Sequence, residues 1–184
     1  MCKEILQKSL IVFVLVFAIS TKTVKSQGLN EEKKGLYFHS FSISPEIFIM
    51  EHAYSAGGFA ISADISYTAN KIVYTFSASI GEEVAIWYQG DSFQQLNLLI
   101  GKEFEVTNKF FIDTHIGAGV LFYQTSDRYD YDTKLTFPIK MALPIIAKFR
   151  FKTGEKFSIG AKLQANFNSI NNLYSAGVLL QWNY

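Results

Sequence analysis

Asp113 and His115 stand two residues apart, a spacing that puts an imidazole and a carboxylate on one face of an extended strand. Such a pair can hold a proton or bind a metal ion. The chain has three histidines and one cysteine, Cys2, and no other histidine or cysteine stands at a metal-ligand spacing from the pair. The favoured interpretation is therefore an internal ion pair, with no metal site and no cofactor.

His39 and Ser40 offer a base beside a hydroxyl. A serine nucleophile needs its base within hydrogen-bond reach, whereas neighbours in a strand point to opposite faces. The pair fails on geometry unless His39 meets Ser42 or a residue of another strand. We therefore expect no catalytic residue and no enzyme activity.

One polar stretch combines carboxylates with tyrosines: Asp127, Arg128, Tyr129, Asp130, Tyr131 and Asp132. Three aspartates can bind Ca²⁺ through carboxylate oxygens, and the two tyrosines can contact a partner at a surface. Most stretches of this kind are only solvated. Contact with an unidentified extracellular ligand is the functional hypothesis, and solvation is its alternative.

The composition limits what kind of domain can carry these residues. With 184 residues, of which 49 % are hydrophobic, the chain has material for one domain. A net charge of +1 without a long basic run excludes a nucleic-acid partner. The aromatic content of 16 % is high for a water-soluble domain, so many rings need a place out of water.

The first residues are typical of an export signal. Lys3 and Lys8 supply positive charge before an apolar run over residues 10–19. This run is too short to span a bilayer as a helix. We predict a signal peptide over residues 1–26, cut after residue 20 or 26, and a polar lead over residues 27–35. Residues 36–184 then form the domain.

Strict alternation of apolar and polar residues defines the domain. Residues 157–167 alternate throughout, and the same period of two recurs in 59–68, 110–123 and 174–184. Four further segments complete eight predicted strands: 36–50, 72–87, 93–104 and 137–151. Short connections such as 69–71 alternate with long ones, the longest being 126–135, which is typical of an antiparallel up-and-down barrel.

Three positions fit this pattern poorly. His39 shares the apolar phase of the first strand, and Pro45 and Pro144 each remove a hydrogen-bond donor from a ladder. The run Gly81, Glu82 and Glu83 predicts a bulge in the third strand or an early exit into the connection.

The aromatic residues indicate which face meets lipid. On the apolar phase they fall near strand ends and bracket aliphatic residues, at a separation of roughly 25 to 30 Å, the height of a lipid-facing band between two girdles. The predicted girdle residues are Phe110, Phe122, Phe137, Phe149, Phe157, Phe167, Tyr174 and Trp182.

The opposite phase is rich in Gly, Ser, Asn and Gln and carries a few charges, which suits a narrow, filled lumen. The predicted lumen network is Asp64, Glu103, Asp113, His115, Lys140, Lys148, Arg150 and Lys162. The alternative to a membrane barrel is a secreted soluble β-sandwich or lipocalin-like protein with its apolar face inside.

From residue 35 to the end, the chain resembles the small outer-membrane β-barrel superfamily, which includes the OmpA and OmpX barrels and short Bacteroidetes proteins. The resemblance rests on the signal peptide, the eight strands and the closing run Leu180, Trp182 and Tyr184, which looks like the strand presented to the barrel assembly machinery. It implies a monomer in the cell outer membrane, in contact with that machinery and with outer-membrane lipids.

The resemblance leaves the activity open. We expect a non-enzymatic barrel with a structural or surface-binding role. The alternatives are a narrow pore for small solutes, a barrel enzyme that modifies lipid A, and the soluble binding protein.

Overall fold

A computed structural model describes residues 35–51, 56–84, 90–126, 134–136, 139–169 and 171–184. The predicted signal peptide, the polar lead up to residue 34, the stretch 127–132 and Phe137 lie outside these residues. No helix of the described part is long and apolar enough to cross a bilayer.

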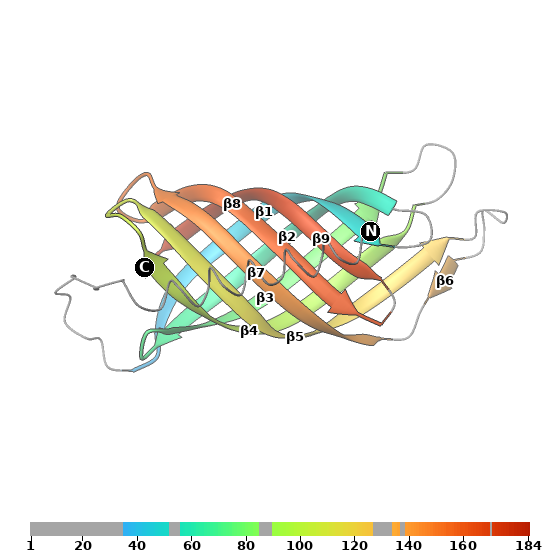
Figure 1. Cartoon of the computed structure of the whole chain (residues 1–184), viewed down its shortest axis with the longest axis horizontal. Helices are drawn as coiled ribbons and strands as arrows, with labels where there is room; N and C mark the ends of the chain where they lie inside the picture. Colours follow the sequence, from blue (N-terminus) through green and yellow to red (C-terminus); the bar gives the residue numbers. More distant parts are fainter. Residues whose placement is uncertain (1–34, 52–55, 85–89, 127–133, 137–138, 170) are drawn as a thin grey trace, which may run out of the picture. The chain divides into compact units, whose positions relative to one another are not determined.

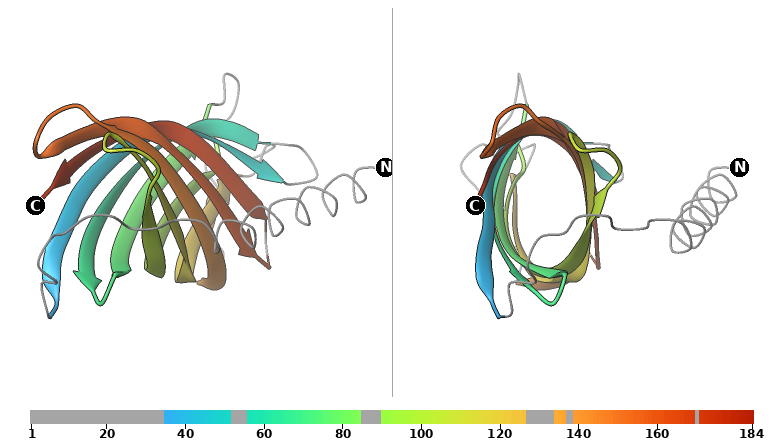
Figure 2. Two further views of the ribbon diagram at one scale, coloured as in Figure 1. Left: turned by 60° about the vertical axis from the view of Figure 1, so that its left-hand side comes forward. Right: turned by 90° about the vertical axis from the view of Figure 1, so that its left-hand side faces the viewer.

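The described residues form antiparallel strands that close into a ring (Figure 2). Each strand of the ring pairs with the next along the chain, with β5 pairing directly with β7, and β9 returns to pair with β1. The ring consists of β1 (Tyr37–Glu51), β2 (Ala56–Ala69), β3 (Ile72–Glu83), β4 (Ser92–Glu105), β5 (Phe110–Ser126), β7 (Lys140–Lys152), β8 (Phe157–Asn168) and β9 (Asn172–Asn183). The predicted eight-stranded barrel is thereby confirmed.

The ninth strand, β6 (Lys134–Thr136), pairs only with the end of β5. The sequence assigned residues 137–151 to one strand. The regular strand, β7, begins instead at Lys140.

The connections differ between the two ends of the barrel (Figure 1). The short ones, 70–71, 106–109 and 153–156, lie at the end where β1 starts and β9 finishes, which is termed the inner rim. The opposite end, termed the outer rim, carries the long connection between β5 and β7. Asn70 and Lys71 have φ of 50° and 66°, as the tight two-residue hairpin between β2 and β3 requires.

Apolar side chains cover the exterior of the barrel. Phe59, Leu98 and Met141 are 67 %, 68 % and 71 % exposed. The alternate residues are mostly polar and point inward, where Lys148 and Lys162 are buried. A soluble protein would bury the apolar phase, so the β-sandwich and lipocalin-like alternatives are wrong. Lipid is the solvent that this exterior fits.

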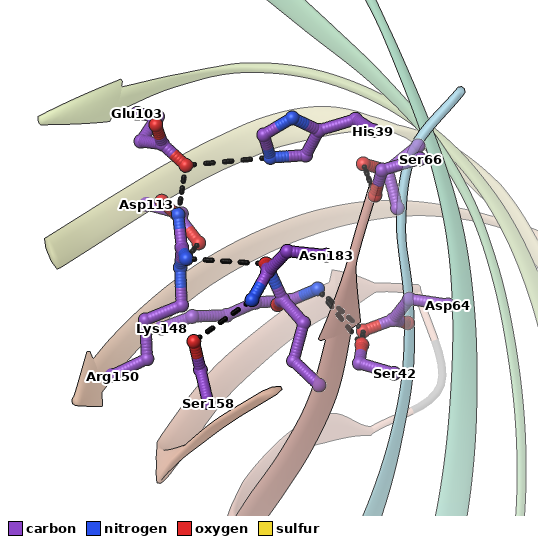
Figure 3. Close-up of polar contacts among 12 residues, drawn as sticks. His39, Ser42, Asp64, Ser66, Glu103, Asp113, Lys148, Arg150, Ser158 and Asn183 are labelled. Carbon is purple, nitrogen blue, oxygen red and sulfur yellow. Dashed lines mark hydrogen bonds and ion pairs between the residues drawn. The ribbon is translucent and has the colours of Figure 1, made fainter. Parts of the chain in front are cut away.

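A bulge in β1 corrects the predicted position of His39. The pairing of β1 with β2 shifts by one residue between Phe38 and Ser40. The extra residue moves His39 off the apolar phase, and its side chain enters the lumen (Figure 3).

Pro45 and Pro144 each lie where the pairing with one neighbouring strand is interrupted. The pairs between β1 and β9 are interrupted around Pro45, while its pairing with β2 continues. The pairs between β5 and β7 are interrupted around Pro144, while its pairing with β8 continues. A missing N–H is tolerated because it faces the interrupted side.

β3 ends at Glu83, within the stretch 81–83 where an early exit from the strand was the alternative prediction. Gly81 itself marks no bulge, because β3 runs through it in continuous register with both neighbours. The residue is small for another reason: a Cβ at this position would lie 2.4 Å from the ring of Phe93, which packs over it inside the barrel.

Candidate functional site

The lumen contains the candidate site, because the charged side chains that point inward meet there. The charge network is defined as these side chains: His39 and Glu46 of β1, Asp64 of β2, Glu103 of β4, Asp113 of β5, Lys148 and Arg150 of β7, and Lys162 of β8. In a barrel, every second residue of each strand points towards the barrel axis. Residues distant in sequence therefore become neighbours.

Asp64 lies at the centre of the network. Its Oδ2 is 2.8 Å from Lys148 Nζ and accepts a hydrogen bond of 3.2 Å from the Ser42 hydroxyl (Figure 3). Lys162 Nζ lies 3.2 Å from both Oδ1 and Oδ2. Both oxygens of this buried carboxylate are in use, which is the condition under which a buried ion pair is stable.

Glu46 is a network residue that was not predicted. Its Oε1 lies 3.4 Å from Lys162 Nζ, and its carboxylate accepts hydrogen bonds from Ser62 and Ser175. The sequence did contain the signal, since Glu46 continues the inward phase of the serines at positions 40, 42 and 44.

Arg150 bridges two acids nearer the inner rim. Its Nε and Nη2 donate to Asp113 Oδ2 and Oδ1 at 2.7 and 3.3 Å, and Nη2 also bonds Glu103. Nη1 donates to Asn183 at 3.3 Å, and the guanidinium lies 4.7 Å from the centroid of the Phe111 ring. The planar guanidinium has several donors in a fixed geometry, so it can bind two carboxylates and an amide at the same time.

His39 completes this end of the network. Its Nε2 lies 3.3 Å from Glu103 Oε2 (Figure 3). The imidazole faces a carboxylate in the lumen, not a serine hydroxyl. The bulge thus brings His39 to a residue of another strand, but not to a nucleophile.

Two of the predicted lumen residues stand apart from these contacts. His115 is buried against Gly101, where a Cβ would meet its ring, and neither of its ring nitrogens has a hydrogen-bond partner among the described residues. Lys140 is half-buried at the outer end of β7 and makes none of the ion pairs given above. In the described part of the chain, no three His, Cys, Asp or Glu residues are grouped as metal ligands.

Towards the outer rim the lumen changes character and becomes apolar. Phe48 and Phe93 pack edge to face with ring centroids 5.0 Å apart. The buried residues of this cluster, termed the apolar plug, are Phe48, Met50, Phe93, Leu121, Tyr123 and Leu173. Sequence reasoning missed the plug, although its signal was visible: apolar residues occupy the polar phase of several strands at the same end.

The described girdle residues all lie on the exterior, near strand ends. At the inner rim, Phe157 contacts Trp182 with ring centroids 5.3 Å apart. At the outer end, Phe167 contacts Tyr174 at 6.3 Å. The remaining members are Phe110, Phe122 and Phe149.

The closing run also lies on the exterior. Leu180 and Trp182 are outward residues of β9, and the backbone N–H of Tyr184 donates to His39 O at 3.0 Å. The end of the chain is therefore fastened to β1 at the inner rim.

Comparisons with known proteins agree with this architecture. No protein-family model matches the sequence, and no curated protein matches it. Among solved structures, Neisserial surface protein A is similar with a TM-score of 0.71 and 7 % identity over 82 % of this chain and 100 % of that one. Ail, the attachment invasion locus protein of Yersinia pestis, is similar with a TM-score of 0.57 and 16 % identity over 82 % and 99 %.

A third similar structure is the N-terminal β-barrel domain of Pseudomonas aeruginosa OprF, with a TM-score of 0.50 and 15 % identity over 79 % of this chain and 97 % of that one. At these identities the likeness concerns the fold. Taken with the closed ring, the apolar exterior and the polar lumen, it shows that the chain has the fold of the small eight-stranded outer-membrane β-barrels.

Proposed function

We propose that the chain is a non-conducting, non-enzymatic outer-membrane barrel that holds its outer connections at the cell surface for a structural or ligand-contacting role. One observation carries the proposal: buried side chains occupy both the inner and the outer part of the lumen. The charge network occupies the inner part, and the apolar plug occupies the outer part.

Burial of the charges argues against a pore. Lys148, Lys162 and Asp64 are each at most 2 % exposed, so water has little access to them. Eight strands enclose an interior just wide enough for side chains. An ion would have to displace paired charges and then cross the rings of Phe48 and Phe93.

The location follows from the exterior. Lipid accepts the outward Phe, Ile and Leu side chains, and the rings near the strand ends suit the two interfaces. The short connections would face the periplasm and the long ones the outside, as in barrels of this type. Export would depend on the predicted signal peptide, and assembly on the closing run of β9.

The surface role rests on the outer connections. The stretch 127–132 combines three aspartates, an arginine and two tyrosines, and it joins strands at the outer rim. Two proteins of similar fold are named a surface protein and an attachment invasion locus protein. We infer a comparable exposure at the cell surface for the outer connections of this chain.

The position of His39 argues against a lipid-modifying enzyme. A lipid substrate approaches from the exterior, whereas the His39 imidazole points into the lumen and faces Glu103. A base without a nucleophile beside it cannot begin acyl transfer.

Two measurements on the membrane-extracted full chain test the proposal. After a urea wash, the protein should stay with the membrane and migrate differently on a detergent gel when heated and unheated. In a planar bilayer the purified barrel should give no current above the lipid background. Release by urea would contradict the membrane location, and stepwise currents would favour the narrow pore.

A further inference from the structure

Charge is distributed unevenly between the two rims. At the inner rim and its turns, the described residues include exposed lysines at positions 71, 102, 109, 152 and 156, against exposed glutamates at 105 and 155. Glu103, at the same end, contacts Arg150 and His39 in the lumen through its carboxylate. At the outer rim the exposed charges of the described residues are Glu51 and Glu82, whereas Glu83 is buried and Asp91 and Lys140 are half-buried.

Three of the inner lysines lie on two adjacent turns. The backbone N–H of Lys152 donates to Lys109 O at 2.8 Å, so the ends of β5 and β7 meet at these residues. Lys156 closes the same turn as Lys152, and its carbonyl accepts from the Asn183 N–H at 2.7 Å. The lysine cluster, defined as Lys109, Lys152 and Lys156, thus spans strands β5 to β9.

The lysine cluster lies directly next to the aromatic rings at the inner rim. Phe110 and Phe151, next to Lys109 and Lys152, stack with centroids 4.7 Å apart. Lys156 Nζ lies 5.9 Å from the centroid of the Tyr184 ring. Ammonium groups immediately beyond a ring girdle lie at the depth of lipid phosphates.

We propose that the lysine cluster binds the headgroups of anionic phospholipids in the periplasmic leaflet, so that the barrel gathers such lipids around its inner rim. The inference rests on the proposed membrane location and extends it to a lipid class. Charge complementarity and continuity with the apolar exterior support this occupant. A lysine near an anionic surface favours binding by about fivefold.

The chain carries its own reporter for a test. Trp182 lies on the exterior at the inner rim, in contact with Phe157, which follows Lys156. The other tryptophan is Trp87, so W87F leaves Trp182 as the single tryptophan. We would reconstitute the W87F full chain in vesicles in which brominated phosphatidylglycerol or brominated phosphatidylcholine replaces part of the unlabelled lipid, and compare how strongly each quenches Trp182.

We expect brominated phosphatidylglycerol to compete for the site near Trp182 several-fold better than brominated phosphatidylcholine at low salt. The preference should fall in 1 M salt, where the screening length is about 3 Å. It should also fall to near equality in K152Q/K156Q, whose side chains are exposed at the end of β7 and in the following turn, so that the substitutions leave the barrel contacts intact. K134Q, at the other end, is the matched control and should keep the preference.

The outcomes separate the two proposals. Equal quenching by the two brominated lipids in the unsubstituted background would overturn the lipid preference and leave the membrane location standing. Quenching by neither lipid would overturn the membrane location itself. A preference that survives in K152Q/K156Q would assign it to groups other than the cluster and so contradict the inference.

Discussion

Lys162 Nζ lies 3.2 Å from each carboxylate oxygen of Asp64, although β8 and β2 are separated in the ring by β9 and β1. The ion pair therefore spans the lumen and joins two walls of the barrel that share no backbone hydrogen bonds. Backbone ladders fix each strand to its neighbours. Only side chains such as these fix one wall to another.

Removing one partner of this ion pair should destabilise the barrel. In D64N, Lys148 and Lys162 lose their shared counter-charge, and a buried, unpaired charge costs about 3 to 5 kcal/mol. K162M should cost a similar amount, because Lys148 still neutralises Asp64 but the buried Glu46 loses the cation that it faces. Urea unfolding in lipid vesicles, followed by the gel shift between folded and unfolded forms, measures both.

The double variant D64N/K162M sharpens this test. Because the two residues share one interaction, its loss of stability should be smaller than the sum of the single losses. K156M, at an exposed turn position, should stay within about 0.5 kcal/mol of the unsubstituted protein. Unfolding of K162M at the same urea concentration as the unsubstituted chain would show that the cross-lumen pair contributes nothing.

The sequence was sufficient to predict the strands and the direction of their faces. In a barrel of eight strands, lipid on one side and a narrow lumen on the other impose a period of two, and residues 157–167 follow it without exception. The turns were readable for the same reason, since the inner connections are short and rich in polar residues. The sequence therefore showed which residues of each strand point outward and which point inward.

The partners of each charge were not predictable from the same pattern. Alternation tells which face a side chain occupies but not its height along the barrel axis, which depends on strand tilt and stagger. Lys140 shares the phase of Lys148 yet lies at the opposite end from Arg150. The bulge at His39 and the break between β6 and β7 interrupt the period itself, so a residue count across them assigns the wrong face or the wrong strand start.

Replacing Arg150 by lysine should weaken the inner end of the network even though the charge is kept. A lysine cannot reproduce the fork that bonds Asp113 twice while contacting Glu103 and Asn183. We expect R150K to lower the free energy of unfolding by about 1 to 3 kcal/mol, measured by the same urea titration. The loss should be larger in R150M, which leaves two acids without a cation. Equal stability of R150K and the unsubstituted chain would mean that the charge alone is sufficient.

Emptying the apolar plug should reduce stability without opening a pore. F48A and F93A each remove a buried ring from the outer half of the lumen, at about 3 to 5 kcal/mol. Because the charge network still fills the inner half, planar-bilayer currents of either variant should stay at the lipid background. F59A, which truncates an exposed exterior ring, serves as the control for stability. Steady currents through F48A or F93A would show that the plug, and not the network, seals the barrel.

Gly81 tests the packing of the plug most directly. A methyl group there would lie 2.4 and 2.7 Å from two ring atoms of Phe93 and 3.0 Å from the Cβ of Ala60. G81A should therefore force the ring to move and destabilise the barrel by about 1 to 3 kcal/mol. In G81A/F93L the smaller side chain should remove the overlap, so that the second substitution costs less in the G81A background than alone. G154A is the matched control, because no atom lies within 4 Å of a Cβ at that turn. Strictly additive losses for G81A and F93L would indicate that Gly81 is small for a reason other than the ring it faces.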